Sequence, residues 1–263
     1  MDDWMTDAAE ILYRARIGRT RLAGLPEPCR PRDEREAYRV QSRVHALLRE
    51  AGRGPLGGHK IGCTTAVMQE FLRIASPCAG GMLRADIHRG DTTLRFADYR
   101  HVGVECEIAA SIARDLPPRE LPYRTDEVVA AIDAYMPAIE VVDDRWQDYK
   151  AVDTPTLIAD DFFHAACVLG APVAQAKVDD LAAVAGLMRI NGVEVGRGRG
   201  ADVLGHPHNA VTWLANAHGK RGAWLRAGDV VLTGSVVATK WVQRGDAIEV
   251  SLAGLGEARV RFL

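Results

Sequence analysis

The sequence has few of the features that would mark a disulfide-stapled, metal-knuckle or membrane protein. Its five cysteines among 263 residues are scattered, and no two of them are separated by only two residues. This pattern excludes a disulfide framework and a zinc knuckle, and it is typical of a reducing compartment. No apolar run approaches the roughly 20 residues of a membrane-spanning helix. The acidic N-terminus also lacks the pattern of a secretory signal. We therefore expect a cytoplasmic protein without membrane association.

The sequence also lacks an excess of charge of either sign. It has 33 Lys and Arg against 35 Asp and Glu, a formal net charge of −2. This balance excludes a polybasic nucleic-acid binder. Hydrophobic residues make up 48% of the chain and charged residues 26%, which excludes extended disorder. A chain of this length can bury a substantial core as one large or two small domains.

The first 57 residues are predicted to form a helical N-terminal region. Asp33 and Glu36 have the spacing of a capping box, in which each side chain accepts a hydrogen bond from the other residue's backbone amide. The helix they open carries Ala37, Val40 and Val44 on one apolar stripe. This helix ends in a glycine-rich segment at residues 51–58.

From residue 58 onward, short apolar runs separated by Gly, Pro and Asp predict strands. Helical patterns remain at residues 126–135, 155–168 and 209–218. Because these helices do not alternate regularly with the strands, a doubly wound parallel sheet is disfavoured. The sequence therefore predicts an α+β protein, with helices at residues 1–57 and a largely β domain at residues 58–263.

Two carboxylates are predicted to lie side by side on one strand at residues 102–109. Side chains alternate faces along a strand, so Glu105 and Glu107 share the face opposite Val104 and Cys106. Glu140 occupies a similar apolar strand further along. Together the three carboxylates would form an oxygen-rich site for Mg²⁺ or Mn²⁺. The spacing alone, however, favours an ordinary solvent-exposed strand face over a metal site.

Other chemically capable residues stay ambiguous from the sequence alone. Lys60 leads into a short apolar strand, where partial desolvation would suit it to acid/base work. An ammonium that simply reaches water is the alternative. Cys63, Cys78 and Cys106 have no neighbours that mark a lowered thiol pKa, which favours small buried residues. No serine lies in a nucleophile-elbow context, so a hydrolase triad is not supported.

The order of several segments resembles the 2-oxopent-4-enoate hydratase / 4-oxalocrotonate decarboxylase family, within the fumarylacetoacetate hydrolase superfamily. The resemblance runs in register over nearly the whole chain. The segments that carry it are AYRVQ at 37–41, KIGCT at 60–64, VECEIA at 104–109, PAIEVVD at 137–143, IAD at 158–160, NG at 191–192, ADVLGHP at 201–207, AVTWLAN at 210–216, AGDVVLTG at 227–234, GD at 245–246 and GLG at 254–256.

The resemblance implies a mixed β-roll, or β-barrel-like, catalytic domain of the fumarylacetoacetate hydrolase type behind the N-terminal helices. It also implies a divalent metal, Mg²⁺ or Mn²⁺, on Glu105, Glu107 and Glu140, which reverses the preference from spacing. The expected activity is that of a lyase that hydrates a 2-hydroxy-2,4-dienoate or a related unsaturated 2-oxo acid. The residues expected at the substrate are Lys60, Phe163, Thr233 and Gly234.

The sequence departs from the family pattern at two places near the expected pocket. Cys78 stands where hydratases of the family usually carry an acidic residue, and a thiol is a poor base at neutral pH. Phe162, Phe163 and His164 replace a small polar segment, so His164 offers a new acid/base group. We predict catalytic roles for Lys60, His164 and Cys78.

These departures keep other functions open. The alternatives are a 4-oxalocrotonate-type decarboxylase, a divergent tautomerase or C–C bond-cleaving enzyme on a non-standard substrate, and a non-enzymatic partner subunit. The resemblance also implies a homo-oligomer that can associate with a neighbouring pathway enzyme.

Overall fold

The computed structural model describes residues 3–65, 68–70 and 74–263. The helices within these residues are α1 (Asp3–Gly18), α2 (Glu34–Leu48), α4 (Thr125–Val129), α5 (Thr154–Ala159) and α6 (Pro207–Lys220). The strands are β1 (Leu56–Gly62), β2 (Cys78–Leu83), β3 (Ile87–Arg89), β4 (Thr92–Leu94), β5 (Val102–Ile112), β6 (Ile132–Asp143), β7 (His164–Leu169), β8 (Val173–Ala174), β9 (Ala185–Ile190), β10 (Val193–Arg199), β11 (Val230–Trp241), β12 (Ala247–Leu252) and β13 (Gly256–Phe262). No helix among the described residues has the length and apolar character needed to cross a membrane.

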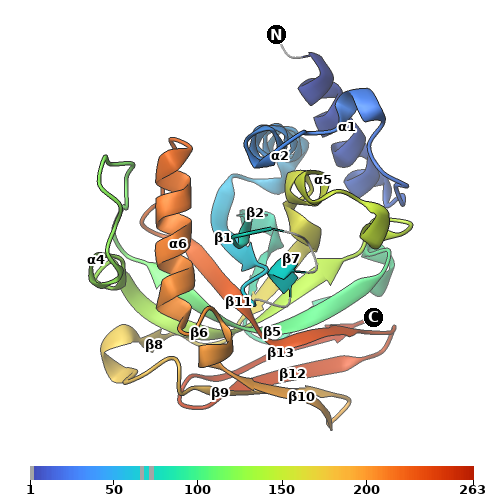
Figure 1. Cartoon of the computed structure of the whole chain (residues 1–263). Helices are drawn as coiled ribbons and strands as arrows, with labels where there is room; N and C mark the ends of the chain where they lie inside the picture. Colours follow the sequence, from blue (N-terminus) through green and yellow to red (C-terminus); the bar gives the residue numbers. More distant parts are fainter. Residues whose placement is uncertain (1–2, 66–67, 71–73) are drawn as a thin grey trace.

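Two sheets form the body of the protein. The larger, eight-stranded sheet has the order β2-β1-β11-β5-β6-β7-β3, with β8 paired to β6, and the smaller sheet has the order β10-β9-β12-β13-β4. In Figure 1 the smaller sheet lies below the curled larger sheet, while α1, α2 and α5 lie above it. The predicted fold class, helices followed by a curled mixed sheet, is confirmed.

The N-terminal helices form much as the sequence predicts. The Asp33 side chain accepts a hydrogen bond from the Glu36 backbone amide at 2.8 Å, which satisfies a free donor at the start of α2. The Glu36 carboxylate accepts from the Arg32 backbone amide at 2.8 Å instead of from the Asp33 amide. Arg32 offers a guanidinium in addition to its amide, so Glu36 gains an ion pair by reaching one residue further back.

Two predicted helices are partly wrong. The pattern at residues 155–168 gives α5 only as far as Ala159, and β7 begins at His164. Between them Asp161, Phe162 and Phe163 all have positive φ angles of 53°, 49° and 70°. Left-handed backbone costs about 1 kcal/mol or more for each such residue and ends any helix. The pattern at residues 126–135 likewise gives α4 only as far as Val129, and β6 begins at Ile132.

The two faces of β5 serve different purposes. Val104, Cys106 and Ile108 are fully buried in the main core, as the alternation predicts. The opposite face carries the glutamates beside Ala109, which belongs to a second, smaller apolar cluster. This cluster consists of Met82, Ala109, Met136, Ala138, Cys167, Leu169, Val230 and Leu232. The concave side of the sheet therefore combines an apolar floor with a group of acids.

Candidate functional site

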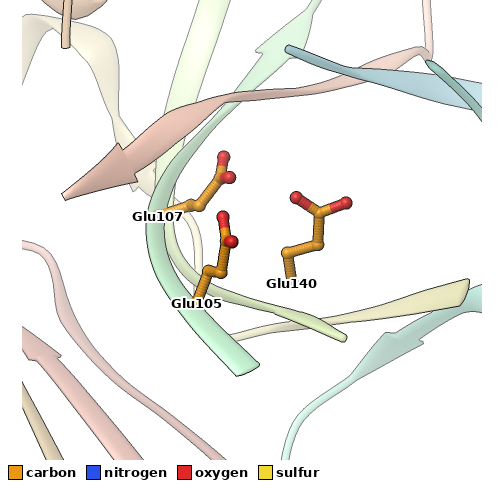
Figure 2. Close-up of side chains that lie close together, drawn as sticks. All are labelled: Glu105, Glu107 and Glu140. Atoms are coloured by element: carbon orange, nitrogen blue, oxygen red, sulfur yellow. The ribbon is translucent and has the colours of Figure 1, made fainter. Parts of the chain in front are cut away.

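Glu105, Glu107 and Glu140 converge on one point of the concave face. Glu105 and Glu107 lie two residues apart on β5, and Glu140 on β6 is paired directly with Glu105. One ligand atom from each of the three residues lies within 4.8 Å of the others. Figure 2 shows β5 curving around the group, with the carboxylates turned toward one another. The clustering that sequence spacing alone disfavoured is therefore present.

Each carboxylate has a different set of partners. Glu107 is fully buried; its Oε2 accepts from the Gly234 amide at 2.8 Å, whereas its Oε1 has no hydrogen-bond partner. Glu105 accepts from the Thr239 hydroxyl. Glu140 is hydrogen-bonded to His164 and forms an ion pair with Lys60. A buried, unpartnered carboxylate oxygen is costly, and it is aimed into a cluster of acids that a cation would satisfy.

The electrostatics of the cluster also fit a cation. Burial, and then the charges of the other two glutamates, raise the pKa of Glu107 well above its usual value. Burial and Glu140 raise the pKa of Glu105. For Glu140, burial acts in the same direction, but Lys60 and His164 outweigh it and lower the pKa. Three oxygen donors under mutual repulsion fit a hard divalent cation such as Mg²⁺ or Mn²⁺.

Lys60 projects from β1 into the same group. Its Nζ lies 3.3 Å from Glu140 Oε1, and only 3% of the residue is exposed. Burial would lower the pKa of Lys60, but the charges of the three glutamates outweigh burial and raise it. The side chain is therefore a buried ammonium, and the solvent-reaching alternative does not apply.

His164 is the first residue of β7 and faces Glu140. Its Nδ1 lies 2.8 Å from Glu140 Oε1, and its buried Nε2 has no partner. Since an ionised carboxylate only accepts, Nδ1 carries the proton of this contact. Nε2 is then the ring atom that can exchange a proton with a bound molecule.

Of the other residues predicted at the substrate, the structure brings Gly234 into contact with the carboxylates. Gly234 donates its amide to Glu107 and has a φ of 122°; a Cβ there would lie 2.5 Å from the Thr64 hydroxyl. The Thr233 hydroxyl donates to the Ile108 carbonyl at 2.9 Å, which ties β11 to β5. The Phe163 ring packs edge-on against Phe162. Substrate contact by these residues stays a prediction.

Cys78 lies at the start of β2 with no exposed surface. A hydrogen bond with the Cys63 thiol, together with burial, raises the pKa of Cys78 well above its usual value. The group is therefore a neutral thiol, which can donate a hydrogen bond but cannot act as a base near neutral pH. A catalytic role for Cys78, as a hydrogen-bond donor, stays a prediction.

We expect Cys78→Ser to keep at least about a third of the wild-type kcat, because a hydroxyl preserves the donor. Cys78→Val removes the donor at similar volume and is the matched comparison. Steady-state turnover at several pH values measures both. A pH-dependent loss in Cys78→Ser of tenfold or more would instead identify the thiolate as a base.

The sequence reasoning missed two contributors to the site. Thr239 donates to Glu105 from β11, and its position follows from the pairing of β11 with β5, which no local pattern reveals. Asp161 supports the turn before His164 through contacts with Arg16 and His45. The sequence signal for Asp161 is that a second acidic residue directly follows Asp160.

The chain is similar in sequence to known proteins over most of its length. Residues 77–263 match the family described as fumarylacetoacetate (FAA) hydrolase C-terminal. A 2-keto-4-pentenoate hydratase of Paraburkholderia xenovorans (strain LB400) is 33% identical over 259 residues, which covers 97% of this chain and 94% of the relative. 2-Keto-4-pentenoate hydratase 1 of Dechloromonas aromatica (strain RCB) is 36% identical over 262 residues, covering 98% and 97%.

A solved structure extends the comparison to three dimensions. The 4-oxalocrotonate decarboxylase from Pseudomonas putida G7, complexed with magnesium and adipate, superimposes with a TM-score of 0.92 at 26% sequence identity. The match covers 100% of this chain and 98% of the decarboxylase.

Proposed function

The chain belongs to the fumarylacetoacetate hydrolase family, and from this premise we propose that it is a divalent-metal-dependent lyase. Its proposed reaction is the hydration of a 2-hydroxy-2,4-dienoate or a related unsaturated 2-oxo acid. The names of its relatives, 2-keto-4-pentenoate hydratase and 2-hydroxyhexa-2,4-dienoate hydratase, support this substrate class. The observation that carries the proposal is the buried set of Glu105, Glu107 and Glu140 beside the ammonium of Lys60.

Glu105, Glu107 and Glu140 would hold Mg²⁺ or Mn²⁺, the ions that their oxygen donors suit. When bound, such an ion stabilises negative charge that develops on the 2-oxygen of a 2-oxo acid. The protein supplies the remaining parts. The buried apolar residues on the same face of the sheet keep the surroundings of the glutamates dry.

Lys60 and His164 are the groups proposed to handle the substrate's charge and protons. The Lys60 ammonium is placed to bind the substrate carboxylate or to donate a proton from Nζ. His164 keeps its orientation through Nδ1 and exchanges a proton through Nε2. Hydration of the dienol removes one proton from the 2-hydroxyl and one from the water that adds at C4, and it delivers one proton to C5 and one to C3. Two separate groups that exchange protons suit this sequence.

A decarboxylase is the second candidate, favoured by a specific observation. The family acid is absent at Cys78, and the neutral thiol there cannot replace a carboxylate base. In that reaction the distal carboxylate leaves as CO₂, and its bonding electrons pass to the 2-oxo group. The similarity to the 4-oxalocrotonate decarboxylase at 26% identity supports this candidate. Homo-oligomerisation and association with a pathway enzyme stay predictions.

We expect chelation to abolish turnover, with recovery on addition of Mg²⁺ or Mn²⁺. The measurement is the loss of dienol absorbance from a 2-hydroxy-2,4-dienoate before and after treatment with EDTA. Detection of CO₂ from 4-oxalocrotonate under the same conditions separates the decarboxylase from the hydratase. A rate that is unchanged by complete removal of divalent ions would contradict both metal-dependent functions.

A further inference from the structure

A short segment closes the curled sheet beside the active site. Residues 160–163, here called the seam, lie between β2, at one edge of the larger sheet, and the start of β7, next to the opposite edge. The Gly81 amide of β2 donates to Asp161 Oδ1 at 2.8 Å. Gly80 permits the close approach, because a Cβ at that position would lie 2.8 Å from the Asp161 carbonyl oxygen.

Basic side chains hold the two carboxylates of the seam. Arg145, which follows β6, places its Nε 2.9 Å from Asp160 Oδ2, and the other two belong to the N-terminal helices. Arg16 of α1 forks between them, with Nε 2.7 Å from Asp160 Oδ1 and Nη1 2.8 Å from Asp161 Oδ2. His45 of α2 places Nε2 2.8 Å from Asp161 Oδ1. Both aspartates are almost completely buried. Charge-assisted contacts of this kind, shielded from water, fix geometry far more firmly than exposed ion pairs do.

The seam leads directly into the active site. Its three left-handed residues, Asp161, Phe162 and Phe163, turn the chain from α5 into β7. The Phe162 ring lies with its centroid 5.5 Å from the Lys60 Nζ. The next residue after the seam is His164, in contact with Glu140. A strained turn of this kind persists only where surrounding contacts determine it.

We propose that Arg16 and His45 are positioning residues for the active site. Acting through Asp161, they hold the left-handed turn that sets Phe162 over Lys60 and His164 against Glu140. This inference rests on the proposed function and extends it to α1 and α2, which precede the residues matched by the family. The helical region therefore takes part in turnover through the seam.

The test compares Arg16→Gln and His45→Gln with Arg14→Gln, a matched control on α1 whose guanidinium pairs with Glu10 at the exposed surface. Well below the unfolding temperature, we expect the first two variants to lose about 10- to 100-fold in kcat, because small misplacements of catalytic groups cost rates of this order. Mn²⁺ affinity should change little, since the glutamates lie on β5 and β6. Arg16→Lys keeps the charge and should recover part of the loss.

Amide hydrogen exchange of residues 161–166 gives a readout independent of turnover. Exchange should accelerate in Arg16→Gln and His45→Gln but not in Arg14→Gln, since the opened seam exposes these amides more often. Unchanged exchange, or a lowered unfolding temperature with unchanged kcat, would overturn the proposal. If the wild type binds Mn²⁺ but turns over no dienoate or 4-oxalocrotonate, the proposed function fails. The positioning role of Arg16 and His45 is then tested by amide hydrogen exchange and by Mn²⁺-dependent binding of pyruvate.

Discussion

Glu107→Gln should abolish divalent-metal binding and lower turnover by about three orders of magnitude, while making the metal-free protein more stable. Removing one of three oxygen ligands withdraws several kcal/mol of transition-state stabilisation, and each 1.36 kcal/mol is a factor of ten in rate. Glutamine nearly matches glutamate in shape and can still accept from the Gly234 amide. The substitution therefore tests the charge of Glu107 more than its packing.

The gain in stability has an equally direct cause. In the metal-free protein the negative charges of Glu105 and Glu140 oppose ionisation of Glu107, in addition to burial. A gain of about 1 kcal/mol would raise the unfolding midpoint of a domain of this size by about 2–4 °C. Exposed Glu120 provides the matched control, and Glu120→Gln should change neither property. Calorimetry with Mn²⁺ and thermal unfolding in EDTA measure the two effects.

The same residue predicts how the stability of the metal-free protein depends on pH. Glu107 has a usual pKa of 4.5 in the unfolded chain and a raised pKa in the folded state. Between these two values the folded protein holds a proton that the unfolded chain has lost. The Glu107 contribution to the free energy of unfolding therefore falls as the pH rises through this window. Glu107→Gln should remove that slope, and metal binding with turnover unchanged in this variant would refute the site.

The glutamate cluster shows where sequence reasoning succeeds and where it stops. Alternation along one strand correctly places Glu105 and Glu107 together, because the side-chain period of a strand is a local property. The pairing of Glu105 with Glu140 depends on the register of β5 against β6. No local pattern fixes that register, so spacing alone favoured an exposed face. The apolar strand around Glu140 suggested it as the third ligand, but only the family resemblance reversed the preference for an exposed face.

At the seam, the local sequence pattern predicts the wrong structure. Residues 155–168 have a helical pattern, and α5 begins where that pattern does, yet the helix ends at Ala159. The contacts that hold the left-handed turn come from distant residues, among them Arg16 and His45, which are 145 and 116 residues away from Asp161. Tertiary contacts of this kind override local propensity and cannot be found by scanning a window. The affected residues lie directly beside the active site, where such conflicts are expected.

Lys60→Met should have the opposite effect on stability from Glu107→Gln while also removing most turnover. The substitution leaves the buried Glu140 carboxylate with His164 as its remaining described contact from a basic side chain. Breaking a buried ion pair from one side costs about 3 kcal/mol or more. Loss of a group that binds substrate charge or transfers a proton lowers kcat/KM by about 10²- to 10⁴-fold. Lys177→Met, at an exposed lysine, is the control.

The two variants together separate a metal site from a structural ion pair. If the glutamates hold a divalent cation, Mn²⁺ should restore much of the stability that Lys60→Met loses, because the cation supplies the missing positive charge. Turnover should stay low, because a cation held by the carboxylates can neither bind the substrate carboxylate in the place of Nζ nor donate a proton. A structural pair would give a stability loss that Mn²⁺ does not reverse. Recovery of turnover along with stability would remove Lys60 from the proposed chemistry and leave His164 as the group that handles protons.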